Sequence, residues 1–419
     1  MKGCKKNLIN AVLFFFLIFW GKYNTYDEVH LVFDRYDFGD ISLKASTRER
    51  RLAGNKAVAY HITDSTSINT SMRNLLAHVK TKDELTAYLA EKILQHAALN
   101  RKRVVVAWRD RAESSHRSVD LLSSSQEEAD TKLMLHAVDA TNNGATSLRI
   151  YSPDTDVLVL AIRCYPNLAA DTIMVTGTGN NWRVIKLGPI YKTLGPSKAA
   201  ALPGFHALSG ADITGKFAGK GKITCWKVLD HLDDNHDIVV ALSQLGATGT
   251  VSEATSAALE AYVCQLYLPR TTKITNVADA RWWLFKRKQA QAENLPPTKA
   301  ALTHAIARAH YQAMIWYNDI VAFPEIPSPE NYGWNLVDGI FIPVMTHLPP
   351  APDAVTQLVK CRCGRTRCSS HQCKCKKNGL FCTEFCTCCE GEELCDNAPS
   401  NSKVDSDNEE NSDDDDDDV

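Results

Sequence analysis

The cysteines of this chain are distributed very unevenly. Ten of the fourteen fall between residues 361 and 395, and the others are Cys4, Cys164, Cys225 and Cys264. From Cys361 to Cys388 the spacing is C-x-C-x4-C-x4-C-x-C-x6-C-x3-C-x-C, and Cys389 and Cys395 follow. A secreted disulfide scaffold would concentrate its cysteines in a short chain. A dense cluster appended to a large, cysteine-poor body instead favours metal binding in a reducing compartment.

The spacing of these thiols suits several zinc ions better than one. Zinc takes four thiolate or imidazole ligands in tetrahedral geometry at ~2.3 Å. Cysteines one residue apart cannot easily give all their bonds to one ion, but each can bridge neighbouring ions. A segment this short, with few apolar residues, cannot fold on a hydrophobic core, so the metal would supply the folding free energy. A cysteine-rich loop without metal is the alternative.

The segment from Cys361 to Cys395 resembles the tesmin-type CXC domain, in which nine cysteines bind three zinc ions and which often contacts DNA. The resemblance covers about 35 of the 419 residues. It implies as ligands Cys361, Cys363, Cys368, Cys373, Cys375, Cys382, Cys386, Cys388 and Cys395. The last spacing is longer than is usual in the family, so the choice between Cys389 and Cys395 as the ninth ligand stays open.

Basic residues are interspersed with these cysteines. The seven are Lys360, Arg362, Arg365, Arg367, Lys374, Lys376 and Lys377, and no acid lies among them. Such a patch attracts phosphates with a strongly salt-dependent affinity. Family members that enter the minor groove carry a tyrosine where this chain has Gln372, and many have two repeats where this chain has one. We expect a DNA-binding module, with a structural or protein-docking zinc module as the alternative.

A second set of residues suited to chemistry consists of acids at the ends of predicted elements. These are Asp34, Glu128, Asp130, Asp154, Asp156 and Asp212. Two-metal phosphodiester hydrolysis uses ions ~3.5–4 Å apart that are held by converging carboxylates, and magnesium prefers such oxygen ligands. Glu128 and Asp130 could share a site only off a helix N-terminus, because residues two apart on a helix do not face each other. Singly, each acid could be a helix cap or a solvated charge.

The elements expected to position these acids alternate between strand and helix. The patterns predict strands over 28–34, 104–108, 148–152, 172–176 and 182–187, with helices over 81–95 and 126–140. This order predicts an α/β domain with a largely parallel sheet. Carboxylates beyond the C-terminal strand ends of such a sheet face one crevice. From about residue 238 the pattern turns helical, with helices over 252–267, 277–292 and 298–318.

The region from about Glu28 to His231 resembles the flap-endonuclease/XPG-type nucleases of the PIN-like superfamily. The family's strand ending in a metal-binding Asp, its E-x-E, its D-x-D and its G-x-D match Asp34, Glu128-Ala129-Asp130, Asp154-Thr155-Asp156 and Gly210-Ala211-Asp212. Its basic gateway helix matches the stretch that holds Lys44, Arg48 and Arg51. The resemblance implies that the acids hold up to two Mg²⁺ or Mn²⁺ ions, and that Lys44 and Arg48 steady the scissile phosphate.

The glycine-rich stretch 215–222 resembles the helix-hairpin-helix of the same family, within residues 210–233. Glycines let backbone amides approach a phosphate at a helix N-terminus. The expected nucleic-acid contacts are Lys216, Gly219, Lys220, Gly221 and Lys222. A plain turn is the alternative.

The resemblance implies a metal-dependent, structure-specific nuclease that acts on DNA, with RNA also open. One family feature is missing, because a first strand with a further metal-binding Asp would come before residue 27, and no acid lies there. This departure motivates a non-catalytic DNA- or chromatin-binding protein that keeps the nuclease fold as a scaffold. A zinc-stabilised adaptor that ignores nucleic acid is a third hypothesis.

The two ends of the chain differ in composition from the rest. Leu8 to Trp20 is an apolar run of thirteen residues, shorter than the roughly 20 that a membrane span needs, and no small-x-small cleavage site follows it. The run has the layout of a signal peptide, but we expect a buried segment or a wrongly assigned first exon instead. We expect no membrane association unless this run is a true anchor. The whole chain has a net charge of −2, and its last sixteen residues carry ten acids and no base, so the remainder carries +8. A mildly basic body with an acidic tail is common in proteins that contact nucleic acid, and we expect a nuclear protein.

The composition divides the chain into five expected regions. They are an apolar segment (1–24), a PIN-like nuclease-type domain (25–235), a helical extension (236–347), the CXC zinc module (360–397) and a disordered acidic tail (398–419).

Overall fold

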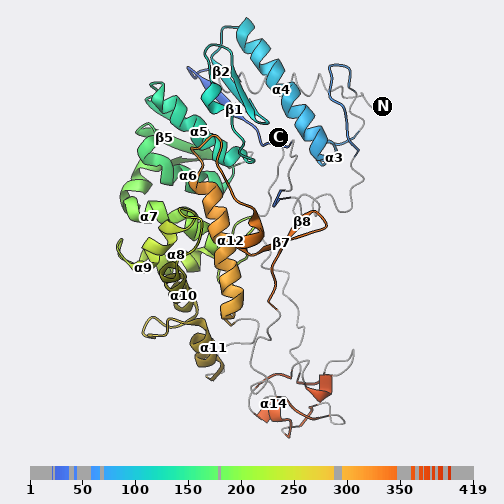
Figure 1. The fold of residues 1–419 in the computed structure, drawn as a ribbon, viewed down its shortest axis with the longest axis vertical. Coiled ribbons are helices and arrows are strands. Elements are labelled where there is room, and N and C mark those ends of the chain that lie inside the picture. The colour runs from blue at the N-terminus through green and yellow to red at the C-terminus, as the bar shows by residue number, and fades with distance from the viewer. Residues whose placement is uncertain are drawn as a thin grey trace.

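The structure is a computed structural model of the whole chain. It describes residues 21, 24–36, 42–44, 58–66, 70–177, 181–286 and 295–346, together with 360–363, 368–370, 372–377, 380–382, 386–389 and 395–397 of the cysteine-rich segment. The apolar run 8–20 and the acidic tail lie outside the described residues, as do Arg48, Arg365 and Arg367. Figure 1 shows the arrangement of the described elements.

The first unit of the fold is a three-stranded sheet with a helix on one face. Its elements are β1 (Val29–Val32), α3 (Met72–Leu76), α4 (Val79–Leu99), β2 (Val104–Trp108), β3 (Arg111–Ser114) and the short η1 (Asp120–Leu122). β1 and β2 are parallel, and β3 pairs with the other edge of β2 in the antiparallel direction. The predicted strand at 104–108 and the predicted helix at 81–95 are confirmed.

The central strand β2 is buried on both faces, and this explains its uninterrupted apolar sequence VVVAW. Successive side chains of a strand point to opposite faces. Val104, Val106 and Trp108 therefore pack with the apolar side of α4. Val105 and Ala107 pack on the opposite face, in a cluster with Leu122 of η1.

The second unit repeats this order of elements. It contains α5 (Ala129–Asn142), β4 (Ser147–Tyr151), α6 (Thr155–Cys164), η2 (Tyr165–Asn167), β5 (Asp171–Thr176) and β6 (Arg183–Lys186). β4 and β5 are parallel and are joined through α6, and β6 is antiparallel to β5. Each unit is thus strand, helix, strand and hairpin strand, although no repeat of fixed period is visible in the sequence.

The prediction of one largely parallel sheet is wrong for the described residues, where the strands form small mixed sheets within an α/β fold. The reason lies in the connections. A parallel crossover needs about a dozen residues or more, usually including a helix, whereas antiparallel strands can be joined by a two-residue hairpin. Only residues 109 and 110 separate β2 from β3, with Arg109 at a φ of +50°. β3 must therefore fold back beside β2.

Helices form most of the rest of the body. They are α7 (Leu187–Ser209), α8 (Lys222–Asp230), α9 (Asp237–Gln244), α10 (Glu253–Tyr267), α11 (Val277–Lys286) and α12 (Lys299–Tyr317). α7 is kinked at Gly195, whose φ is +73°. The main hydrophobic core runs from Met134 to Trp316, so helices on both sides of the expected boundary near residue 235 share it. The predicted helices at 252–267 and 298–318 are confirmed. The predicted helix at 277–292 is described only to residue 286.

Short elements complete the described structure. After α12 come η4 (Pro329–Tyr332) and the antiparallel pair β7 (Trp334–Val337) and β8 (Ile340–Pro343). The cysteine-rich segment contributes α14 (Lys374–Lys377) and η5 (Thr387–Cys389). Among the described helices, none combines the length and the apolar character that a membrane crossing requires.

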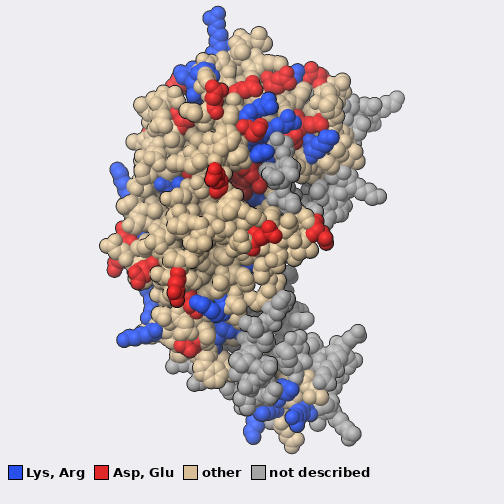
Figure 2. All heavy atoms as spheres, in the orientation of Figure 1, with Lys and Arg blue, Asp and Glu red and all other residues tan. Residues whose placement is uncertain are grey.

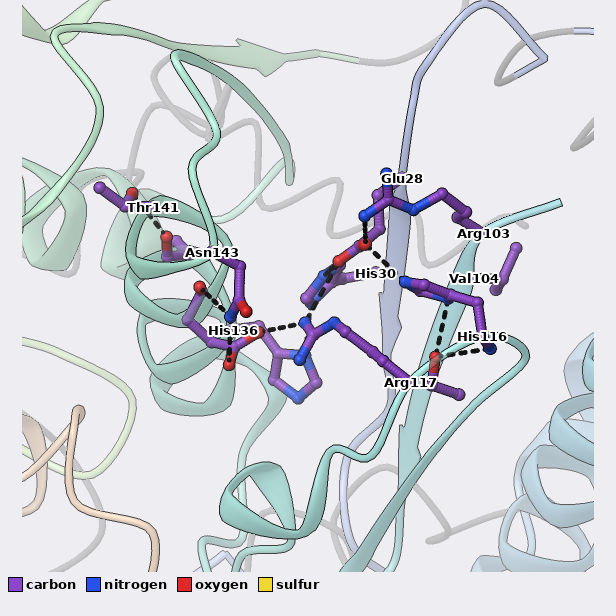
Figure 3. Close-up of polar contacts among 12 residues, drawn as sticks. Glu28, His30, Arg103, Val104, His116, Arg117, His136, Thr141 and Asn143 are labelled. Atoms are coloured by element: carbon purple, nitrogen blue, oxygen red, sulfur yellow. Dashed lines mark hydrogen bonds and ion pairs between the residues drawn. The ribbon is translucent and has the colours of Figure 1, made fainter.

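A polar network joins the first sheet to α5. Glu28, just before β1, lies among His30, Arg103, His116 and Arg117 in Figure 3. Its carboxylate oxygens are 2.7 Å from Nε2 of His30 and 2.7 Å from Nε2 of His116. The bond from His30 and the charge of Arg117 lower the pKa of Glu28 despite its burial. Arg117 also pairs with Asp139 of α5, so the network fixes the helix against the strand whose far end leads to Asp34.

Candidate functional site

The N-terminus of α5 brings three of the predicted acids together. Glu128 is the N-cap residue and Asp130 lies in the first turn. Asp34, just beyond β1, accepts a hydrogen bond of 2.7 Å from the backbone N–H of Ala129. A carboxylate in this position satisfies a free amide and interacts favourably with the positive end of the helix dipole. The geometric condition for Glu128 and Asp130 to share a site is therefore met.

The N-terminus of α6 supplies the next two acids. Asp154 is its N-cap residue and accepts a hydrogen bond of 2.8 Å from the backbone N–H of Asp156. Ligand oxygens of Asp130, Asp154 and Asp156 all lie within 4.8 Å of one another. The N-termini of α5 and α6 thus lie at one carboxylate cluster.

Lys44 links the remaining acid, Asp212, to this cluster. Its Nζ lies 2.8 Å from Oε1 of Glu128 and 3.1 Å from Oδ2 of Asp212. Asp212 follows Gly210, which ends α7 with a φ of +116°. A Cβ at Gly210 would lie 2.6 Å from Cγ of Lys216, so a side chain there would be both strained and crowded. The requirement for glycine explains the G-x-D pattern.

Burial and mutual repulsion make these acids hard to ionise together. Burial raises the pKa of Glu128 to about 7, although Lys44 opposes the shift. Burial and the charge of Asp154 raise the pKa of Asp130 well above its usual range. The pKa of Asp154 is raised by burial and by the charge of Asp156, with a further contribution from Asp212. The charges of Glu128 and Asp212 raise the pKa of Lys44 in spite of its own burial.

The donor set fits a hard divalent cation. Asp130, Asp154 and Asp156 offer only oxygen ligands, which Mg²⁺ and Mn²⁺ prefer over the sulfur and nitrogen ligands typical of zinc. A cation held by these oxygens would offset the repulsion that raises the pKa values of Asp130 and Asp154. Asp34, Glu128 and Asp212 lie around this trio, and Lys44 already neutralises part of the charge of Glu128 and Asp212.

A histidine that the sequence did not single out completes the cluster on one side. His206, buried on α7, places Nε2 2.7 Å from Oδ1 of Asp156. Its Nδ1 lies 2.7 Å from Nζ of Lys222. Burial lowers the pKa of Lys222 to about 8, against the charge of Asp156. A lone histidine in an apolar helix has no spacing signal, so only the fold could connect it with the acids.

The glycine–lysine stretch forms a tight turn ahead of α8. Lys220 donates a backbone hydrogen bond of 3.0 Å to Phe217 O, and Gly219 has a φ of +65°. The amine of Lys220 lies over the ring of Tyr267, 4.8 Å from its centroid. Lys216 is exposed. Lys222 differs from these two, because its amine lies against His206.

A small cavity of about 120 Å³ lies beside Lys44 and Glu128. Its other walls include Leu43, Tyr311 and Gln312.

The segment that carries Glu127 and Glu128 is held at the end of α12. There, the side-chain amide of Gln126 donates to the carbonyls of residues 318, 319 and 321 at 3.4, 3.0 and 2.7 Å.

The cysteine-rich segment forms a separate candidate metal centre. Three groups of four cysteines have sulfurs within 4.8 Å of one another. They are 361, 368, 373 and 382; 361, 382, 386 and 388; and 368, 382, 388 and 395. Cys361 Sγ lies 3.5 Å from that of Cys368 and 3.8 Å from that of Cys382. A tetrahedral zinc with 2.3 Å bonds separates its sulfurs by about 3.8 Å. The seven cysteines of these groups are therefore positioned to hold metal ions, whereas Cys363 and Cys375, also predicted as ligands, belong to none of the three groups.

Backbone and side-chain amides point at several of these sulfurs. Lys376 N–H donates to Cys373 Sγ at 3.4 Å, and Asn397 Nδ2 donates to Cys382 Sγ at 3.3 Å. Burial opposes ionisation of Cys361, yet hydrogen bonds from the Cys363 backbone and neighbouring thiols lower its pKa to about 6. Such donors favour thiolates, the form that binds metal. Cys395 lies in the third group, whereas the side chain of Cys389 lies outside the described residues.

Charge is mixed on the face of the body that Figure 2 shows. In Figure 2, acidic and basic side chains are interspersed over the upper part of the face shown, and its middle is largely uncharged. In the cysteine-rich segment, Arg362, Lys374 and Lys377 are exposed. Lys376 donates from Nζ to Ser369 O at 3.1 Å.

Comparison of the chain with protein-family models, with curated proteins and with solved structures found no match.

Proposed function

We propose that this protein is a divalent-metal-dependent nuclease of the PIN-like, flap-endonuclease type that acts on DNA. The observation that carries the proposal is the convergence of Asp130, Asp154 and Asp156 within 4.8 Å of one another. These acids come from two helix N-termini that are far apart in the sequence. Asp34, Glu128 and Asp212, which the resemblance groups with them, lie around the same trio.

The roles proposed for the residues follow from their chemistry. Asp130, Asp154 and Asp156 would hold Mg²⁺ or Mn²⁺, and the bound ions would supply charge stabilisation at the phosphodiester and a water activated for attack. Lys44, which lies between Glu128 and Asp212, would steady a phosphate oxygen beside the cluster. Asp34 holds the start of α5, and therefore Glu128 and Asp130, in position.

The cysteine-rich segment would supply a second contact with nucleic acid. Its thiols would hold zinc, and Arg362, Lys374 and Lys377 are exposed there for phosphates. The turn with Lys216 and Lys220, ahead of α8, would add a phosphate contact from the body.

Cleavage of DNA tests the proposal directly. The full-length protein, with its zinc retained, is incubated with flap and hairpin DNA in the presence and absence of Mg²⁺. We expect magnesium-dependent cutting that is lost when Asp154→Asn and Asp156→Asn are combined. The exposed Asp120→Asn is the matched control, because it makes the same chemical change outside the cluster. Equal cleavage by the double variant would refute the proposal.

One observation favours a second candidate, a DNA- or chromatin-binding protein without catalysis. Lys44 neutralises part of the charge of Glu128 and Asp212, so a cation of the protein already lies beside the three carboxylates that could hold a metal ion. This candidate predicts salt-sensitive DNA binding that does not change with Mg²⁺ and is not accompanied by cutting.

A further inference from the structure

His206, which is buried, and Lys222, which is partly buried, form a polar chain that ends on the carboxylate cluster. His206 is 5% exposed and lies on α7, with Nε2 2.7 Å from Oδ1 of Asp156. Nζ of Lys222 lies 2.7 Å from Nδ1 of the same ring and 3.1 Å from Nε2. Lys222 is the first residue of α8, directly after the glycine–lysine turn. The chain therefore links that turn to Asp156.

The chemistry of the three groups gives this chain a direction. A lysine ammonium has donors and no acceptor, so Nδ1 of His206 must accept from it. Nε2 then carries the proton of the neutral ring and donates a hydrogen bond to Asp156. A bond of this kind fixes the orientation of a carboxylate and leaves its other oxygen for a cation.

The position of Lys222 is unfavourable on grounds of stability alone. Its positive charge lies at the N-terminus of α8, where the helix dipole is also positive. Its amine is partly withdrawn from water, which is costly for a cation, and within the described residues it contacts the ring of His206. A lysine held in this way is better explained by an electrostatic task than by packing.

We propose that His206 and Lys222 are positioning residues, through which the glycine–lysine turn holds Asp156 in the geometry that binds a divalent cation. This inference rests on the proposed metal site and adds two residues to it. It also connects a surface proposed to contact phosphate with the metal ligands, so that a displacement of the turn weakens cation binding.

We call the contacts from Lys222 through His206 to Asp156 the relay. It is tested by calorimetric titration of the full-length protein with Mn²⁺, with zinc retained in the cysteine-rich segment. We expect His206→Phe to weaken Mn²⁺ binding on the order of 10- to 100-fold, the usual effect of removing the partner of a metal ligand. His206→Gln keeps an N–H donor toward Asp156 and should stay within about 3-fold of the unaltered protein. The same contrast is expected between Lys222→Met, which weakens binding, and Lys222→Arg, which restores it.

Two controls separate the relay from the fold and from the metal site. Lys227→Met removes an exposed lysine from the same helix and should leave Mn²⁺ affinity unchanged. The combined Asp154→Asn and Asp156→Asn variant should abolish binding at the cluster. The unfolding temperature without Mn²⁺ shows whether His206→Phe folds. If it does not, the comparison of Lys222→Met with Lys222→Arg tests the relay.

The outcomes distinguish the inference from the proposed function. Mn²⁺ binding that is lost in the double aspartate variant but unchanged in His206→Phe and Lys222→Met overturns the relay and leaves the metal site standing. Equal loss in Lys222→Met and Lys222→Arg also overturns it. Binding that persists in the double aspartate variant overturns both.

Discussion

Burial raises the pKa of Asp130, and four other carboxylates, those of Asp154, Glu128, Asp34 and Asp156, raise it further by their charges. In the absence of a divalent cation, repulsion among these carboxylates raises the free energy of the folded protein. A bound cation would offset that repulsion. Residues arranged for binding commonly lower stability for this reason. Substitutions that remove one carboxylate charge at a time can test this trade-off between stability and cation binding.

Asp130→Asn should stabilise the protein in the absence of added divalent cation and weaken its response to Mn²⁺. Relief of repulsion should raise the free energy of unfolding by about 1–2 kcal/mol, as measured by urea denaturation with zinc retained. Asp120→Asn, at an exposed position, should have little effect. A destabilised Asp130→Asn variant would show that the acid is needed for the fold instead.

The raised pKa of Glu128 predicts a pH dependence of stability. Its pKa is about 7 in the folded protein, against an ordinary 4.5, so the folded state binds the proton more tightly than the unfolded state. The resulting stabilisation is fully present below about pH 4.5 and is lost as the pH rises through about 7. Without divalent cation, this group should lower the free energy of unfolding by up to roughly 3 kcal/mol across that window.

Urea denaturation at pH 5 and at pH 7.5 measures this loss. Glu128→Gln cannot ionise, so the variant should show a smaller fall between the two pH values. Added Mn²⁺ should stabilise the unaltered protein more at pH 7.5 than at pH 5, because protons compete for the same oxygens. A fall of equal size in both proteins would rule out Glu128 as its source.

At the scale of elements, the close approach of α7 and α9 positions His206. A Cβ on Gly204 would lie 2.1 Å from the backbone oxygen of Leu242 and 3.2 Å from Cβ of Leu245. Glycine is therefore required here by space, although it disfavours a helix interior. Any shift of α7 would move His206, two residues further along the helix.

Gly204→Ala should destabilise the protein even though alanine is the better helix former. The gain in helix propensity is ~1 kcal/mol, but the backbone of α9 cannot move aside as a flexible side chain could. We expect a net loss of about 1–3 kcal/mol, the usual range for overpacking, measured by urea denaturation. Gly249→Ala, with open space around its Cβ, should change stability by under about 0.5 kcal/mol. Similar effects at the two positions would contradict the close approach.

At the scale of the whole molecule, two separate kinds of site are proposed to act on one nucleic acid. The body carries the carboxylate cluster and the cysteine-rich segment carries exposed basic residues. Phosphate contacts set the salt dependence of binding, whereas a few metal-ligating acids contribute little to it. The two contributions can therefore be measured independently.

Combining Lys374→Gln with Lys377→Gln should reduce the salt dependence of DNA binding. Each lost phosphate contact lowers the slope of log K against log salt concentration by about 0.9, so we expect a reduction of about 2. Fluorescence anisotropy with a labelled duplex at several salt concentrations measures this slope. The Asp154→Asn and Asp156→Asn variant should keep the original slope. An unchanged slope in the double lysine variant would exclude these residues from the DNA contact.

Local patterns in the sequence were sufficient for the features that depend on near neighbours. The apolar run of β2 and the periodic helices α4, α10 and α12 were predicted close to their observed bounds, because their patterns reflect the faces that they bury. The cysteine cluster was predicted because its cysteines lie close together in the sequence, and their sulfurs lie close together in the structure. Helix α7 was not predicted, because its glycines and prolines are unfavourable in a helix interior and interrupt the helical pattern of the sequence. The nuclease family and the zinc family remain predictions.

The sequence by itself determined which acids were available, in which order, and at which element ends. Only the tertiary structure decided that Asp130, Asp154 and Asp156 share one site, that Lys44 bridges Glu128 and Asp212, and that His206 and Lys222 continue the chain of contacts. The physical reason is distance along the chain. Side chains tens of residues apart meet through the packing of α5, α6 and α7 into one core, and no local pattern of spacing records that packing.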